Sequence, residues 1–335
     1  KIFILFYRHI HICRYINKRR KKMKRLAVLL ALVMTVGLVG CGNSDTQSKT
    51  ETTSETKEET TTEEAFEGAY VVNADYVKEN LDDIILVDAR GEDAANKETI
   101  KGAIPIAWQY LATCEDGKSG DANWGCILDT ERLSERLGEK GLDPNKEIVL
   151  FAAAQNGWGD DGRIAWELIA AGYKDVKMVD GGFDALKEAG IETAKGGSEP
   201  KAVDVKIDSI DTTHVINTDE LKANYDDYKV VDVRADEEYD GETLYGEAKG
   251  GHLPGAIHIR YTDLFQKSGM LKSNAEITKM FEDAGITKDD KVVTYCTAGI
   301  RSGYMQLILE MCGFKNTQNY DESYYRWCAV EDVEK

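Results

Sequence analysis

The chain has 335 residues and is acidic, with 60 Asp and Glu against 42 Lys and Arg. Its length suits two ordinary domains, and the negative balance argues against a general role in nucleic-acid binding. The charge is uneven: residues 1–40 hold 10 Lys and Arg and no acid, so the other residues carry a formal charge of −28.

The N-terminal segment has the pattern of an export signal. Residues 18–25 are almost all basic, and the apolar run 26–40 is too short for a comfortable membrane span but suits a signal peptide. The run ends in Leu38-Val39-Gly40-Cys41-Gly42, which resembles the lipobox of bacterial lipoproteins. That resemblance implies cleavage before Cys41 and a lipid on its thiol. We therefore expect a lipid-anchored protein on the extracytoplasmic side of the cell membrane; the alternative is an uncleaved N-terminal anchor.

Two further segments follow from this hypothesis. Met23 stands where such a signal would start, so residues 1–22 are interpreted as an upstream extension, and 1–40 as extension plus signal peptide. Residues 41–66 are dominated by Ser, Thr, Glu and Lys, which cannot bury enough apolar surface to offset ordering entropy. They are predicted to be a disordered tether.

The remaining chain repeats itself. Asp88 and Ala152 are separated by as many positions as Asp232 and Cys296, and three motifs occur twice in the same order. We interpret this as an internal duplication, with domains at 67–195 and 215–335 and a linker at 196–214. The paired motifs are residues 84–90 and 229–234, 102–106 and 255–259, and 147–152 and 291–296.

Each copy alternates short β-branched runs with helical patterns. Ile277, Met280, Phe281 and Ala284 share one helical face, and residues 304–311 form a second apolar helix that Gly313 ends. This alternation predicts two α/β domains, each with a mostly parallel central sheet covered by helices on both faces.

Cys296 is the main candidate for chemistry. It follows the apolar run 291–295, and a loop of small residues then leads through Arg301 into a helical pattern. Backbone N–H groups and a helix N-terminus next to a thiol lower its pKa and favour an anion. The alternative is a buried structural cysteine.

These motifs resemble those of the rhodanese (sulfurtransferase) family. The resemblance rests on Asp-x-Arg at 232–234, Gly-His-Leu-Pro-Gly-Ala at 251–256, and Tyr-Cys-x-x-Gly-x-Arg-Ser at 295–302, and it covers about residues 68–190 and 215–332. It implies a tandem sulfurtransferase of the thiosulfate or 3-mercaptopyruvate type. The first domain, with Ala152 at the cysteine position, would be inactive.

The resemblance also implies a mechanism. Cys296 would take sulfane sulfur from an anionic donor, thiosulfate or 3-mercaptopyruvate, and pass it from a persulfide to a thiol or cyanide without any cofactor. The loop would bind the persulfide, through Thr297, Ala298, Gly299, Ile300 and Arg301. Arg260 is a further candidate for binding the donor, because an acidic body needs local positive charge at the site.

Other functions remain open. A non-enzymatic persulfide carrier or binding lipoprotein is one alternative. A phosphatase or arsenate reductase is less favoured, because those related proteins use Cys-x5-Arg and this loop is Cys-x4-Arg. A disulfide between Cys114 and Cys126 is an open alternative for an exported protein. Outside the upstream extension, which holds His9 and His11, no cysteine or histidine pair has metal-ligand spacing. The donor, the acceptor, a role for Cys328 in resolving the persulfide, and the oligomeric state stay undetermined.

Overall fold

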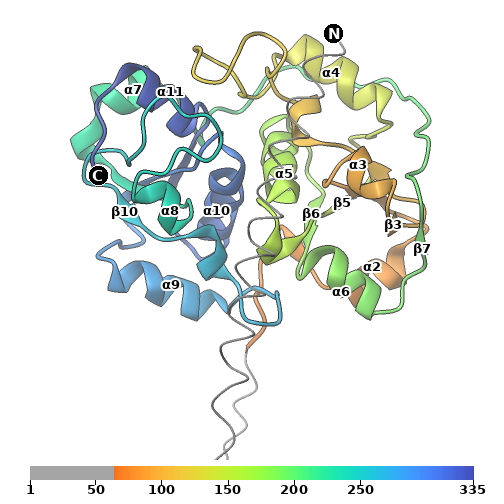
Figure 1. Ribbon diagram of the computed structural model, residues 1–335. Helices are drawn as coiled ribbons and strands as arrows, with labels where there is room; N and C mark the ends of the chain where they lie inside the picture. Colours follow the sequence, from red (N-terminus) through yellow and green to blue (C-terminus); the bar gives the residue numbers. More distant parts are fainter. Residues whose placement is uncertain (1–63) are drawn as a thin grey trace, which may run out of the picture. The chain divides into compact units, whose positions relative to one another are not determined.

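The computed structural model describes residues 64–335. It confirms the predicted α/β class: two parallel sheets, each with helices on both faces (Figure 1). Cys41, the predicted signal peptide and most of the predicted tether lie outside the described residues. No helix between Glu64 and Lys335 is both long and apolar enough to cross a bilayer.

The first sheet comes from the first copy, and all its strand pairs are parallel. In spatial order its strands are β1 (Val71–Val72), β6 (Val176–Val179), β5 (Ile148–Phe151), β2 (Ile85–Asp88) and β4 (Ile104–Pro105). A separate antiparallel pair joins β3 (Thr99–Ile100) to β7 (Thr193–Ala194).

The second sheet repeats this order in the second copy, again with parallel pairs throughout. Its strands are β8 (Val215–Ile216), β12 (Asn316–Tyr320), β11 (Lys291–Tyr295), β9 (Lys229–Asp232) and β10 (Ile257–His258). The predicted duplication is therefore present in the strand order.

Helices cover both faces of each sheet because the central strands, β5 and β11, are buried on both sides. In the first copy, α4 (Thr130–Glu139) and α5 (Asp160–Ala170) pack on one face, and α2 (Ala74–Asn80) and α6 (Gly182–Glu188) on the other. In the second, α9 (Asn274–Asp283) and α10 (Ile300–Met311) cover one face, and α7 (Thr218–Ala223) and α11 (Ser323–Val330) the other. The short helices are α3 (Glu92–Ala95), η1 (Trp108–Tyr110), η2 (Ala154–Asn156), η3 (Tyr225–Asp227), α8 (Asp236–Tyr239) and η4 (Tyr261–Leu264).

The two copies share one hydrophobic core. Helices α5 and α10 pack directly against each other, and buried residues of both copies belong to the same cluster. Gly162 on α5 permits the close approach, because a Cβ built there would lie 2.3 Å from Cδ2 of Tyr304 on α10. The first copy is thus in contact with the helix that follows Cys296.

The segments at the domain boundaries are packed as well. Phe66, within the predicted tether, is buried, and the backbone N–H of Glu67 donates to Asn274 of α9. Val205 and Ile207 of the predicted linker are also buried. The linker packs along the first copy, where the N–H of Ile207 donates to Oγ of Ser134 in the helix at 130–139.

Candidate active site

Cys296 lies at the carboxyl end of β11, directly before the loop that starts α10. Only 1% of the residue is exposed. Gly299 precedes α10 with a φ of +79°, a left-handed conformation that suits glycine. The strand, loop and helix have the order expected from the sequence.

The start of α11 holds the backbone of Cys296 in place. The N–H of Cys296 donates to Oγ of Ser323 at 3.0 Å, and the N–H of Tyr324 donates to the Cys296 carbonyl at 3.0 Å. Ser323 has a φ of +54°, which is uncommon and unfavourable for a non-glycine residue. The surrounding contacts must offset this strain. Because Ser323 and Tyr324 bind the backbone of Cys296, we count residues 321–324 as part of the site.

The surroundings of the sulfur favour the thiolate. Burial, the largest influence, opposes ionisation, but the Arg301 charge, the N–H and hydroxyl of Ser302 and the N–H of Ala298 outweigh it. The net effect lowers the pKa of Cys296 below its ordinary value. The Ser302 hydroxyl donates to Sγ across 3.6 Å. Ser302 was not among the predicted loop ligands.

Arg301 closes the loop through a carboxylate that the sequence analysis missed. Its Nη1 and Nη2 donate to the two oxygens of Glu238, at 2.7 and 2.8 Å, and Nη2 also donates to Oγ1 of Thr297 at 2.8 Å. Thr297 in turn donates to Glu238 at 2.6 Å. Burial raises the pKa of Glu238, but the Arg301 pair and these hydrogen bonds overcome that effect and lower it to about 2. The predicted role of Arg301 toward a donor anion stays a prediction.

A fully buried arginine of the first copy reaches this loop. Arg163 of α5 donates from Nη1 to the carbonyl of Gly299 at 3.1 Å and to the Asp321 carboxylate. Its Nε donates to Glu167 and its Nη2 to the carbonyl of Gly125. Arg163 therefore connects α5 and the loop at Gly125 in the first copy with two segments of the second copy. These are the loop after Cys296, at Gly299, and the segment after β12, at Asp321.

The segment after β12 is fixed by the first copy as well. Asp321 accepts the N–H of Ile127 at 3.0 Å, and Glu322 accepts the N–H of Asn123 at 2.9 Å. Glu322 also accepts the N–H of Thr218 at the start of α7, at 2.8 Å. Glu322 thus links both copies.

The Asp-x-Arg motif is a buried structural pair. Arg234 donates to both oxygens of Asp232 and to the carbonyl of Gly251. The Tyr295 hydroxyl donates to Asp232 at 2.6 Å. The motif thus connects β9, β11 and the 251–256 loop beneath the site.

In the first copy, carboxylates fill the corresponding region. Ala152 stands at the cysteine position, and Asp160 and Asp161 begin α5. The Asp161 carboxylate accepts the Gly162 N–H at 3.0 Å, and burial raises its pKa to about 7. In this copy, backbone N–H groups at the start of α5 that could bind an anion instead donate to a carboxylate of the protein itself, that of Asp161.

An open pocket of about 320 Å³ adjoins the loop; we call it the rim pocket. It lies between the copies, with Trp158 from the first and residues of the second around it. Arg260, the predicted donor ligand, lines this pocket but pairs with Asp236 at 2.8 Å and Asp263 at 2.7 Å. Its charged and aromatic lining residues include Trp158, Arg234, Asp236, Glu237, Glu238, Tyr245, Arg260 and Arg301.

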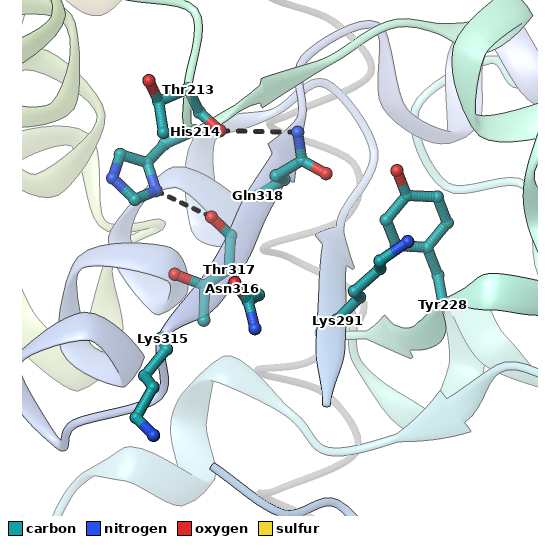
Figure 2. Close-up of a pocket in the computed structure, with 8 residues that line it drawn as sticks. All are labelled: Thr213, His214, Tyr228, Lys291, Lys315, Asn316, Thr317 and Gln318. Carbon is teal, nitrogen blue, oxygen red and sulfur yellow. Dashed lines mark hydrogen bonds between the residues drawn. The ribbon is translucent and has the colours of Figure 1, made fainter. Parts of the chain in front are cut away.

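A second pocket, of about 230 Å³, lies away from Cys296. Figure 2 shows it beside His214, whose Nδ1 is 2.8 Å from the carbonyl oxygen of Thr317. It is lined by Lys291 and Asn316, the first residues of β11 and β12, whereas Cys296 follows the last residue of β11. We therefore assign no catalytic role to it.

The other described cysteines are free thiols. Cys114 and Cys126 form no disulfide in the structure. Cys328 is buried against the carbonyl of Tyr325 and packs in the second copy's own core cluster. Between Glu64 and Lys335, no group of three or more His, Cys, Asp or Glu side chains could hold a metal ion.

Comparison with known proteins places this architecture in a family. The family model of the rhodanese-like domain matches residues 73–189 and 217–330. A Mycobacterium leprae protein named "Putative thiosulfate sulfurtransferase" is 26% identical over 274 residues, covering 78% of this chain and 96% of that protein. "Sulfur carrier protein TtuD" of Thermus thermophilus is 28% identical over 281 residues, covering 77% and 93%.

Solved structures show the same fold. The wild-type structure of EanB superposes with a TM-score of 0.70 at 20% identity, covering 80% of this chain and 69% of that one. The chain belongs to the rhodanese family and carries two copies of its domain.

Proposed function

We propose that the protein is a sulfurtransferase that carries sulfane sulfur as a persulfide on Cys296. The observation that carries this proposal is the buried thiol with lowered pKa after β11, in the loop that leads into α10, with Arg301 five positions later. Family membership and the relatives' names support sulfur transfer. The first copy, with Ala152 in place of a nucleophile, would have only a structural role.

The proposed reaction has two half-reactions and needs no change in net oxidation state. The Cys296 thiolate attacks the outer sulfur of a donor such as thiosulfate; the donor S–S bond breaks and sulfite leaves with its electron pair. An acceptor then attacks the outer sulfur of the persulfide. The Cys296 S–S bond breaks, and the thiolate returns.

Intact-mass spectrometry of the purified whole chain tests this function. After reduction, incubation with thiosulfate or 3-mercaptopyruvate should add the mass of one sulfur atom, which maps to Cys296 and is removed by cyanide. Cys296→Ser should gain nothing, whereas Cys312→Ser should load as the wild type does. Absence of the adduct with both donors on folded protein would contradict the proposal.

A persulfide carrier is the second candidate, favoured by the name of the Thermus thermophilus relative. A carrier would load Cys296 in the same experiment but would turn over poorly with thiosulfate and cyanide in the steady state. Comparing the single-turnover rate of loading with the steady-state rate separates the two candidates.

We also propose that Cys41 anchors the protein to the outer side of the cell membrane through lipid. The proposal rests on the lipobox-like sequence 38–42. Expression in a bacterial host fed labelled palmitate should give a labelled wild type and an unlabelled Cys41→Ala. A wild type without label would contradict the proposal.

A further inference from the structure

Among residues 64–335, no positively charged side chain that lines the rim pocket is without an ion-pair partner. All three arginines that line it are ion-paired: Arg301 with Glu238, Arg260 with Asp236 and Asp263, and Arg234 with Asp232. The pocket therefore lacks a free guanidinium with which to attract an anion.

Carboxylates are in excess around the same pocket. Glu237 lines it, is exposed, and pairs with no Lys or Arg among residues 64–335. The three arginines have four carboxylates as ion-pair partners, and Glu237 adds a fifth. The five carboxylates are those of Asp232, Asp236, Glu237, Glu238 and Asp263. The mouth of the pocket is thus locally negative in a chain that is already acidic.

Two exposed aromatic side chains, one from each copy, line the pocket and pack edge to face against each other. Trp158 is 51% exposed and Tyr245 is 42% exposed, although both are large and partly apolar. Their ring centroids are 5.9 Å apart, at an interplanar angle of 85°. Tyr245 belongs to the second copy, and Trp158 to the first-copy loop that replaces a catalytic loop. Exposed aromatic faces beside carboxylates are the chemistry that binds an organic cation.

We propose that the rim pocket is the subsite for the sulfur acceptor and that it selects an acceptor carrying a positive charge, such as an ammonium-bearing thiol. Trp158 and Tyr245 would contact the cationic group, and Glu237 would supply the opposite charge. This inference rests on the proposed function, because it concerns the second half-reaction at Cys296.

The transfer step balances without a further reactant. The acceptor thiolate attacks the outer sulfur of the Cys296 persulfide, and a new S–S bond forms to the acceptor. The bond to Cys296 Sγ breaks and its electron pair remains there as thiolate. The acceptor leaves as a persulfide, its thiol proton having passed to solvent. An anionic donor would still meet the N–H groups around Cys296, so the two half-reactions would use different parts of the site.

Three small thiols of similar size test the proposal. The whole chain is loaded with sulfur on Cys296, freed of donor, and mixed with cysteamine (cationic), 2-mercaptoethanol (neutral) or 3-mercaptopropionate (anionic), each corrected for its thiolate fraction. The measured quantity is the ratio of the discharge rate constants for cysteamine and 3-mercaptopropionate. Comparing this ratio between variants cancels the intrinsic reactivity of the thiols.

The ratio should fall about fivefold in Glu237→Gln, since unit charges about 4 Å apart in water interact by ~1 kcal/mol. It should fall two- to fivefold in Trp158→Ala. Glu282→Gln, which removes an exposed charge from α9 outside the pocket, should leave it unchanged. Raising the ionic strength to about 1 M should lower the ratio of the two rate constants in the wild type, because the screening length is then only about 3 Å.

Equal ratios in wild type, Glu237→Gln and Trp158→Ala would overturn the inference while leaving the persulfide intact. A ratio that rises in Glu237→Gln or Trp158→Ala would overturn it too. Failure of Cys296 to load any sulfur is a different result, which overturns the proposed function and this inference together.

Discussion

Nη1 of Arg163, in the copy without a cysteine, donates to the carbonyl oxygen of Gly299, three residues after Cys296. The same nitrogen binds Asp321, whose neighbours hold the backbone of Cys296. The guanidinium of Arg163 is fully buried and binds two carboxylates and two carbonyls, so removing one of these partners should lower the stability of the protein strongly. The first copy thus contributes to the geometry of the loop that follows Cys296, which gives it a structural role although it has no cysteine at the corresponding position.

Arg163→Lys should slow persulfide formation tenfold or more. The lysine keeps the charge, but one ammonium cannot reach Gly299, Gly125, Asp321 and Glu167 together. Single-turnover loading of Cys296 from thiosulfate measures the effect, with circular dichroism to verify folding. Arg132→Lys, on the exposed part of α4, is the matched control and should load normally. Unchanged loading in Arg163→Lys would show that the loop keeps its geometry without this contact.

Ser302→Ala should make Cys296 less reactive at neutral pH. The variant loses the hydroxyl that donates to Sγ, while the Ser302 N–H and the Arg301 charge remain. The pKa of Cys296 should therefore rise toward its ordinary value, and alkylation by iodoacetamide at pH 7 should slow roughly two- to tenfold, the factor that one hydrogen bond supplies. The pH dependence of the alkylation rate measures this. Ser268→Ala, on an exposed turn, is the control; identical profiles for both variants would contradict the assignment.

The local part of the site was predictable because it is contiguous in sequence. The strand, Cys296, the small-residue loop and the following helix all obey short-range patterns, and the duplicated motifs predict the shared strand order. The class of fold follows from the same alternation of strands and helices. Family resemblance added the chemistry of the thiol.

The rest of the site could not be predicted, because it depends on contacts across the fold. Arg163 meets Gly299 over 136 positions, and Glu238 meets Arg301 over 63. No pattern near either residue indicates its partner. Trp158 was noted only as an aromatic residue in a long loop, and its position beside Tyr245 requires the packing of the two copies. For Arg260, the sequence could not reveal that Asp236 and Asp263 hold its guanidinium.

Glu238→Gln should destabilise the protein by about 3–5 kcal/mol at pH 7, because it leaves the buried Arg301 guanidinium without its counter-charge. The pKa of Glu238 is lowered to about 2 in the folded chain, despite burial, mainly by Arg301. Its contribution to stability is therefore complete above its ordinary pKa of 4.5 and is lost as the pH falls toward 2.

Urea unfolding of wild type and Glu238→Gln between pH 7 and pH 3 measures the difference in the free energy of unfolding. The difference should shrink at the acid end. Glu282→Gln is the exposed control on α9 and should track the wild type throughout. If the difference in the free energy of unfolding between wild type and Glu238→Gln does not change with pH, the pKa of Glu238 is not lowered in the folded chain.

Asp161→Asn should stabilise the protein in mildly alkaline solution. Burial raises the pKa of Asp161 from 3.8 to about 7, against the opposing effect of backbone N–H groups. A raised carboxyl pKa contributes stability that is complete below the unfolded value, near pH 4, and is lost as the pH rises through about 7. At pH 8 the ionised carboxylate costs on the order of 4 kcal/mol relative to a neutral side chain. Asn keeps an oxygen to accept the Gly162 N–H and carries no charge.

The free energy of unfolding of Asp161→Asn should therefore exceed that of the wild type at pH 8, and the two should converge below about pH 4. Urea titrations at four or five pH values across this range measure the difference. Asp83→Asn removes an exposed carboxylate from the same copy and should show no such pH-dependent gain. If Asp161→Asn is no more stable than the wild type at pH 8, the pKa of Asp161 is not raised. The backbone N–H groups at the start of α5 would then offset the cost of burying the ionised carboxylate.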